Sequence, residues 1–219
     1  MLGKNIHGLR LSSRSFRRLR KSVPSILSDC PSLRFVSFYY GGFFTEFPAD
    51  DNANASNGQT LAKWLFTALP NNVPKMYKCS LYIDYDENWS FKIAAFKAAF
   101  TNSSSPANFI VVIWFRLSFA HFVVPFNLTN ELTREQLALK RINSDRFLLI
   151  RCPIARDADK WTKWEEEAIG WEINDQRNRI YIDIYREDQI GDGLLDEIPD
   201  PSDLQQKCMN ELLRSDRSF

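Results

Sequence analysis

The side chains that could bind a metal ion are few and far apart in this sequence. The two histidines, His7 and His121, have no Cys/Asp pair beside them at the spacing that zinc sites use. The four cysteines show no CxxC spacing; they are Cys30, Cys79, Cys152 and Cys208. Such isolated thiols are typical of buried cysteines in a reducing compartment rather than of a metal cluster or redox dithiol. We therefore expect neither a metal site nor a cofactor.

Three other segments contain residue types that could do chemistry. The serines of residues 103–105 have no Gly-x-Ser-x-Gly elbow and no base in view, so we interpret them as a solvated turn. Residues 84–87 are acidic but lack the glycine and closing glutamate of a calcium loop, and a strand-to-helix connection explains them. Gly191-Asp192-Gly193 lacks the flanking strand and helix of a phosphate loop. We therefore expect a protein that is not an enzyme.

The strongest charge pattern is a basic cluster near the start of the chain. Its members are Arg10, Arg14, Arg17, Arg18, Arg20 and Lys21. A basic helix can bind RNA or phosphate in a salt-dependent way, although basic runs are commonly the solvated face of a helix. The formal net charge of the whole chain is only +1, which gives no global reason to expect a nucleic-acid or membrane partner. A nucleic-acid-binding module that uses Arg10 to Lys21 is thus the alternative interpretation.

Large aromatic side chains could anchor a partner protein. The chain contains 17 Phe and 6 Trp, and such rings fill cores as well as interfaces. The connection between residues 41 and 58 is polar in its second half but carries Phe43, Phe44 and Phe47 in its first half. These three phenylalanines, together with Arg17 and Arg18, are the residues that we expect to contact a partner.

A second group of aromatic residues lies in the last third of the chain. Trp161, Trp164 and Trp171 recur at helical spacing, so they share one helix face. Partner anchors and core residues both fit this pattern, and the spacing favours the core.

The elements that would position these residues form a repeated strand–helix unit. The predicted strands are Ile6–Leu11, Leu33–Phe38, Met76–Leu81 and Phe109–Trp114, and a proline shortly precedes each of the last three. Amphipathic helices are predicted after Ser12, around Leu61–Ala68 and around Ile93–Phe100. Stacked strand–helix units predict a solenoid with a parallel sheet, a fold that usually binds other proteins.

The pattern changes after residue 118. Strands are predicted at Phe122–Leu128, Gln136–Ile142 and Phe147–Ile150, with a hairpin turn at residues 143–145. A helix should open at Asp157 and a last strand should cover Ile180 to Ile184. We predict an α/β fold with a mostly parallel sheet over residues 1–118, an antiparallel β meander with a packed helix over 119–190, and a mobile acidic and polar tail over 191–219.

Several motifs of this chain recur, in the same order, in a known family. They include Gly8-Leu9-Arg10-Leu11, Asp29-Cys30-Pro31-Ser32-Leu33-Arg34, Phe47-Pro48-Ala49-Asp50-Asp51, Leu61-Ala62-Lys63-Trp64-Leu65, Pro106-Ala107-Asn108-Phe109-Ile110, Val124-Pro125-Phe126-Asn127-Leu128-Thr129-Asn130, Leu149-Ile150-Arg151-Cys152-Pro153-Ile154, Lys163-Trp164-Glu165-Glu166-Glu167-Ala168-Ile169 and Ile190-Gly191-Asp192-Gly193. With these motifs the chain resembles the C-terminal region of F-box domain-containing proteins of plant-parasitic nematodes. The resemblance covers nearly everything from Asn5 to Leu194.

The resemblance implies a leucine-rich-repeat-like region that recognises the substrate of a ubiquitin ligase. In such proteins an N-terminal F-box docks onto the adaptor subunit of a cullin ligase, and the C-terminal region captures an unknown target protein. No F-box segment is visible before Asn5, so we expect the adaptor to be a partner only if an F-box lies upstream. The resemblance supplies no catalytic or target-contact residues.

The cellular location is predicted from the start of the chain and from its apolar runs. Residues 1–20 have no apolar stretch of the kind found in a signal peptide, and Phe109–Phe115 is too short to cross a bilayer. We therefore expect a cytoplasmic or nuclear protein without a membrane partner.

Overall fold

The computed structural model describes residues 6–38, 42–82, 89–116, 120, 123–171 and 179–182. All of them belong to one unit, Leu2–Tyr185. The predictions for His121, for the acidic turn at residues 84–87, for Cys208 and for the tail at 191–219 lie outside the described residues.

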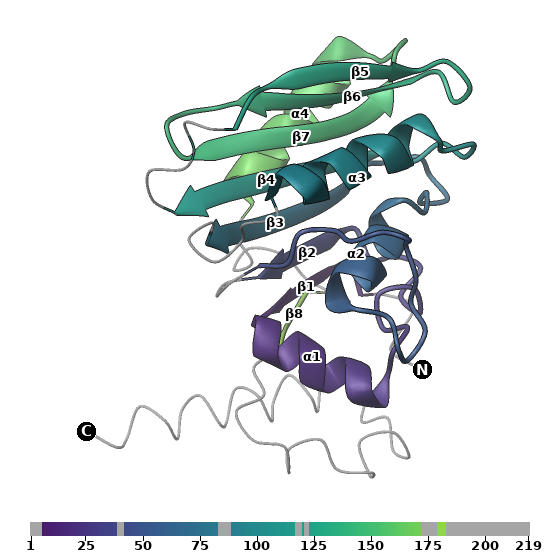
Figure 1. The fold of residues 1–219 in the computed structure, drawn as a ribbon, viewed down its shortest axis with the longest axis vertical. Coiled ribbons are helices and arrows are strands. Elements are labelled where there is room, and N and C mark those ends of the chain that lie inside the picture. The colour runs from purple at the N-terminus through teal and green to yellow at the C-terminus, as the bar shows by residue number, and fades with distance from the viewer. Residues whose placement is uncertain are drawn as a thin grey trace. The chain divides into compact units, whose positions relative to one another are not determined.

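A single mixed sheet of eight strands runs through the described part of the chain, in the order β5-β6-β7-β4-β3-β2-β1-β8 (Figure 1). The strands are β1 (Gly8–Leu11), β2 (Phe35–Phe38), β3 (Lys75–Tyr82), β4 (Phe109–Arg116), β5 (Phe126–Asn130), β6 (Glu135–Arg141), β7 (Arg146–Pro153) and β8 (Arg179–Ile182). The first four lie side by side and parallel, as the repeated unit predicts. The three strands β5, β6 and β7 form the predicted antiparallel meander, and β7 joins it to β4.

The last described strand corrects the prediction that residues 119–190 contribute antiparallel strands. β8 pairs in parallel with β1, with Gly8 opposite Arg179 and Leu11 opposite Ile182. After the meander the chain therefore returns to the far edge of the parallel strands. The alternation of Ile180 and Ile182 predicts a strand but does not reveal its neighbour.

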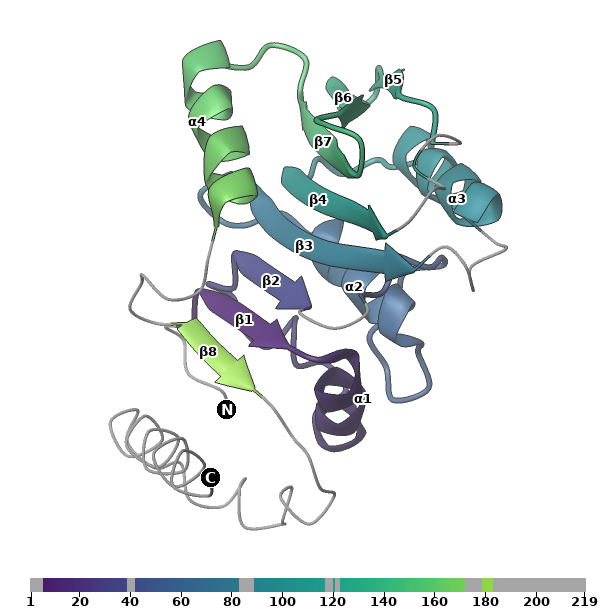
Figure 2. The ribbon, with the colours of Figure 1, turned by 90° about the vertical axis from the view of Figure 1, so that its left-hand side faces the viewer.

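In the described part of the chain, four helices lie on the two faces of this sheet. They are α1 (Ser13–Ser22), α2 (Asn57–Leu65), α3 (Trp89–Thr101) and α4 (Ala158–Gly170). Figure 2 shows α1, α2 and α3 on one face and α4 on the other. None of the helices in the described ranges is long and apolar enough to cross a membrane.

Local sequence signals set the helix ends. The Ser12 side chain caps α1 by accepting a hydrogen bond from the Ser15 backbone N–H, and α1 ends at Ser22, two residues before Pro24. The Asp157 carboxylate caps α4 by accepting from the Lys160 backbone N–H at 3.0 Å, which confirms the predicted helix start.

Two apolar clusters fill the space between the helices and the sheet. The larger one lies under α1, α2 and α3 and is rich in phenylalanine, and the smaller one lies under α4. In the larger cluster the Phe96 ring meets the Phe109 and Phe66 rings edge-on at centroid distances of 5.8 and 5.4 Å. Trp161 and Trp171 are buried in the smaller cluster, which confirms the prediction that the tryptophan face packs in the core.

Helix α3 offers a matched pair of phenylalanines for a test of this packing. Phe96 is 0% exposed, whereas Phe91 is 72% exposed on the same helix. We expect Phe96→Ala to lower the free energy of unfolding by about 3–5 kcal/mol, because it leaves a cavity in the core. Phe91→Ala should change it by less than about 0.5 kcal/mol, and denaturant unfolding of both variants measures the difference. Equal losses would contradict the described packing of α3.

Candidate functional site

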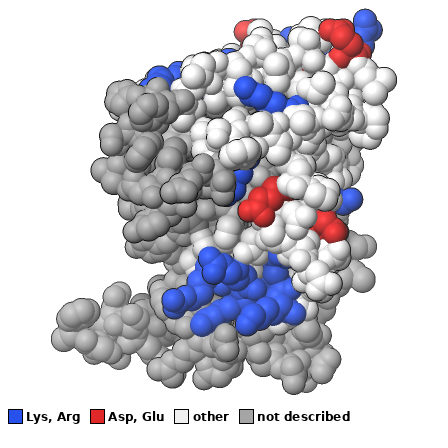
Figure 3. All heavy atoms as spheres, in the orientation of Figure 1, with Lys and Arg blue, Asp and Glu red and all other residues white. Residues whose placement is uncertain are grey.

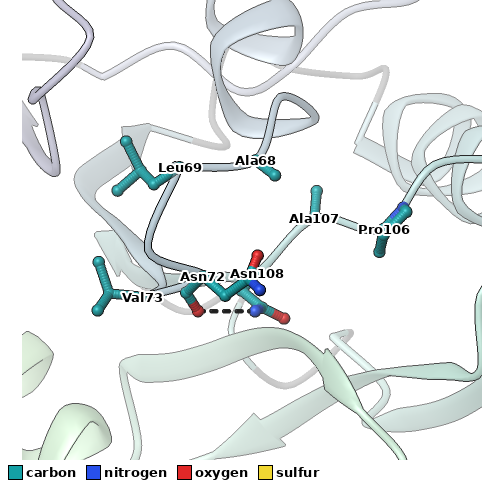
Figure 4. Close-up of a pocket in the computed structure, with 7 residues that line it drawn as sticks. All are labelled: Ala68, Leu69, Asn72, Val73, Pro106, Ala107 and Asn108. Carbon is teal, nitrogen blue, oxygen red and sulfur yellow. Dashed lines mark hydrogen bonds between the residues drawn. The ribbon is translucent and has the colours of Figure 1, made fainter.

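A shallow hollow lies where the segment after α2 meets the segment before β4 (Figure 4). It is lined by Ala68, Leu69, Asn72, Val73, Pro106, Ala107 and Asn108. Its volume is about 20 Å³, whereas ligand pockets usually occupy roughly 300–1,000 Å³. The Asn108 side-chain amide donates to the Asn72 carbonyl at 2.9 Å, and the Lys75 backbone N–H donates to the Asn108 carbonyl, so the polar groups here join the two segments.

The described residues that were considered for metal binding are His7, Cys30, Cys79 and Cys152, and they do not form one group. Within the described ranges no group of three or more His, Cys, Asp and Glu side chains could hold a metal ion. His7 is exposed just before β1, and its backbone carbonyl accepts hydrogen bonds from Arg34 and Phe35. Cys30, Cys79 and Cys152 are all buried, as predicted for isolated thiols.

A buried ion pair holds the loop between α3 and β4 against the meander. Arg151 and Glu135 are 0% and 1% exposed, and the Arg151 Nη2 donates to the Glu135 Oε2 at 2.6 Å. The same Nη2 group donates to the Ser103 hydroxyl at 3.1 Å and to the Ser105 carbonyl at 2.8 Å. The other carboxylate oxygen, Oε1, accepts from the Ala107 backbone N–H. Ser103 is therefore an acceptor in a structural network, where the sequence pattern indicated a solvated turn.

A second charged side chain is buried under α2. Lys75 is 3% exposed; its Nζ donates to the Trp64 carbonyl and lies 5.1 Å from the centre of the Trp64 ring. Burial lowers the pKa of Lys75 from 10.5 to about 7, because the charged form is poorly solvated. The Lys75 Nζ thus binds the last turn of α2.

The basic cluster separates into an outer face and an inner residue. Arg14, Arg17 and Lys21 are exposed and Arg18 is half-buried on α1. We call these four residues the α1 basic face. Figure 3 shows Lys and Arg side chains gathered in one large patch in the region that α1 occupies in Figure 1. Its position on the outside of the molecule fits both a solvated helix face and a binding surface.

Arg20 corrects the interpretation of the whole segment Arg10 to Lys21 as a binding surface. Arg20 is 8% exposed, and its Nη1 donates to the Ala55 carbonyl at 2.8 Å and to the Asn57 side chain at 3.1 Å. Its Nη2 donates to the Asn52 carbonyl at 3.1 Å, and its Nε donates to the Pro24 carbonyl at 3.3 Å. This guanidinium therefore fastens the polar loop before α2 to α1 and is turned away from solvent.

The predicted aromatic contacts Phe43, Phe44 and Phe47 pack inward. Phe44 is 3% exposed and meets the Phe96 ring at a centroid distance of 5.6 Å. Phe43 and Phe47 are partly buried against the same cluster, and Phe43 lies edge-on to Phe38 at 5.3 Å. The prediction that Phe44 contacts a partner is therefore corrected. Its ring completes the core, because the loop lies over the gap between the helices and the sheet.

The loop that carries these rings is pressed against the start of α2. A Cβ on Gly58 would lie 2.7 Å from the Phe44 carbonyl oxygen, so this close approach requires glycine. The Ser56 hydroxyl donates to the Glu46 carboxylate at 2.5 Å and also caps α2. Of the five predicted partner-contact residues, only Arg17 is exposed.

Further charged side chains join α4 to the sheet. Arg34 binds the Glu167 carboxylate in a bidentate way, at 3.2 and 2.8 Å. The Lys78 ammonium donates to the carbonyls of Ile169 and Trp171 at the C-terminal end of α4, where the helix dipole favours a cation. The charged residues on this face therefore set the position of α4.

Sequence reasoning missed Glu135 and Arg151, although a signal was present. Glu135, Leu137 and Leu139 alternate along β6, so the carboxylate shares the inward face with the two leucines. Arg151 shares the face of Phe147 and Leu149 on β7 in the same way. Two opposite charges on inward positions of paired strands would have indicated a buried ion pair.

The anchoring role of Arg20 can be tested by mutation. We expect Arg20→Ala to lower the free energy of unfolding by about 1–3 kcal/mol, because carbonyls of the loop lose a charged donor. Arg17→Ala is the matched control on the exposed side of α1 and should change stability by less than about 0.5 kcal/mol. Thermal and denaturant unfolding measure both, and equal effects would contradict the inner position of Arg20.

Lys75 makes stability depend on pH in a defined window. The folded chain releases the Lys75 proton near pH 7, whereas the unfolded chain holds it up to about 10.5, so the unfolded state binds more protons between these values. Stability from this group should therefore rise with pH above about 7, by up to about 1.4 kcal/mol per pH unit. Lys75→Met should remove this rise, and Lys63→Met, at an exposed position of α2, should keep it. Denaturant unfolding across this pH range is the measurement, and an unchanged slope in Lys75→Met would refute the assignment.

Comparison of the chain with protein-family models, with curated proteins and with solved structures gives no significant match. The resemblance to nematode F-box proteins therefore rests on the quoted motifs.

Proposed function

We propose that this chain is a non-catalytic protein-binding scaffold. The observation that carries the proposal is the α1 basic face, which lies on the outside of the molecule (Figure 3). The buried charged residues support it, since Arg20, Lys75 and Arg151 are engaged in contacts between elements. The buried charged residues thus hold the elements together, whereas the α1 basic face presents charge to the outside.

The proposal extends to the target-recognition region of an F-box-type ubiquitin-ligase receptor. The motif resemblance supports this extension, and so does the arrangement of β1 to β4, which follow one another in the sheet in chain order. Helices that lie on one face between such strands are typical of a leucine-rich-repeat-like array. The target would be captured by this region, and the cullin-ligase adaptor would be contacted by a separate F-box.

A second candidate function is a nucleic-acid-binding module. The specific observation in its favour is the same α1 basic face, whose arginines and lysine could neutralise phosphates. It predicts binding to RNA or DNA that falls steeply as the salt concentration rises and that weakens in the variant Arg17→Ala/Arg18→Ala.

A reconstituted ligase tests the receptor function. The chain is prepared alone and with an F-box segment fused to its N-terminus, and each form is mixed with the purified adaptor subunit. We expect the adaptor to bind only the fusion. In cells, the fusion should raise the ubiquitination of proteins that the unfused chain also binds directly, and an F-box fused to an unrelated domain is the control. A tight complex between the adaptor and the unfused chain, or identical ubiquitination with the control fusion, would refute the proposal.

A further inference from the structure

The strand β5 forms one edge of the sheet. It pairs with β6 on one side, and within the described part of the chain no strand pairs with its other side (Figure 1). Along such an edge every second residue directs its backbone N–H and C=O outward, away from the sheet. The outer side of β5 is therefore a row of hydrogen-bonding groups with which another extended chain can pair.

The edge lacks the charged side chains that commonly protect exposed strands. The sequence of β5, FNLTN, contains no Lys, Arg, Asp or Glu, and its residues keep one continuous register against β6. The neighbouring strand β6 is paired on both sides and carries Glu135, Lys140 and Arg141. Charge is thus present on the inner strand of the meander and absent from its edge strand.

The side chains of β5 alternate between two surroundings. Phe126 and Leu128 are half-buried against the larger cluster, on the side of α3. Asn127 and Thr129 are exposed on the opposite face of the sheet. A strand laid along β5 would therefore place apolar side chains on the face of Leu128 and polar ones on the face of Thr129. A charged side chain on that strand would find no opposite charge on β5.

Exposed apolar side chains gather around the meander. The described part of the chain has six large hydrophobic side chains that are exposed, and four of them are Val124, Leu132, Ile142 and Ile154. Val124 and Leu132 are each 74% exposed, and they lie just before and just after β5. These two side chains extend the apolar contact area beyond both ends of the strand.

The size of the edge distinguishes a segment of a partner protein from a second copy of this chain. Stable dimers use roughly 20–30 residues on each side, whereas β5 offers 5 residues. A strand of this length spans only about 17 Å. Recognition of a short peptide by strand addition works on this scale, because main-chain hydrogen bonds supply the affinity and alternate side chains supply the specificity.

We propose that the outer edge of β5 binds an extended segment of a partner protein, in which uncharged polar and apolar residues alternate, as an added strand of the sheet. This inference rests on the proposed scaffold function and names a surface and the chemistry of the segment that it takes. The surface is distinct from the α1 basic face, since β5 ends the strand order on one side and β1, which leads into α1, lies near the other end.

The test uses the full chain and two synthetic peptides with blocked ends. One peptide has about seven residues, in which Val and Thr alternate, so that it covers the edge. The other has the same sequence with a methyl group on every internal backbone nitrogen, which removes the donors. Hydrogen exchange followed by NMR reports each amide of residues 126–130. We expect the first peptide to slow exchange at every second amide of β5 by at least about tenfold and the methylated peptide to leave it unchanged.

A matched pair of variants ties the binding to this edge. Asn127→Lys/Thr129→Lys places two charges at exposed positions of β5, the device by which natural edges avoid pairing. It should weaken the binding of the fluorescently labelled first peptide by at least about fivefold. Asn54→Lys/Thr162→Lys adds the same charge at exposed positions before α2 and on α4, and it should change that affinity by less than about twofold. Fluorescence anisotropy measures both.

Four outcomes would overturn the inference. They are unchanged exchange at residues 126–130 with the first peptide, equal binding of the two peptides, equal losses in the two double variants, and a dimer in sedimentation analysis that Asn127→Lys/Thr129→Lys dissociates. The last result would assign the edge to a second copy of the chain. Failure here leaves the reconstituted-ligase result unaffected, since the fused receptor can capture its target through the α1 basic face.

Discussion

The whole structure depends on the burial of β4 on both of its faces. Phe109, Val111 and Ile113 point into the larger cluster, whereas Ile110 and Val112 point into the smaller one. A strand without a polar face must be covered by helices from both sides. Here α3 covers the side of the larger cluster and α4 covers the side of the smaller one. Because β4 also pairs in parallel with β3 and antiparallel with β7, it is the strand at which the repeated units give way to the meander.

Around this apolar centre, different charged residues hold different elements in position. Arg151 with Glu135 secures the loop between α3 and β4, Lys75 secures α2, and Arg20 secures the loop that precedes α2. The Arg20 and Arg151 guanidinium groups have lost water and have gained carbonyl or carboxylate oxygens in return, and the buried Lys75 Nζ donates to the Trp64 carbonyl. The consequence for function is geometric: α1 is held on its inner side so that Arg17 and its neighbours can face outward.

The sequence predicts more of the fold than of the surface. Continuous apolar runs and capping residues locate β4, α1 and α4, because burial and hydrogen bonding act locally there. Side-chain direction is harder to predict. Arg20 follows Phe16 by four residues and so shares its inward face, yet a run of basic residues predicts that all of its members face solvent. The sequence predicts Phe44 as a partner contact, because it does not reveal which loops lie over the core.

The parallel pairing of β8 with β1 has a consequence for how this chain acquires its structure. The two strands are joined by nearly the whole described chain, from Gly8 to Ile182. Contacts of such long sequence separation form late, because closing a long loop costs entropy before any contact is gained. During synthesis on the ribosome, the edge of β1 therefore stays unpaired until the last strand has been made. In this interval the hydrogen-bonding groups of β1 are open to other chains. Chaperone binding to nascent chains, if it follows this exposure, should end only after residues 179–182 have left the exit tunnel.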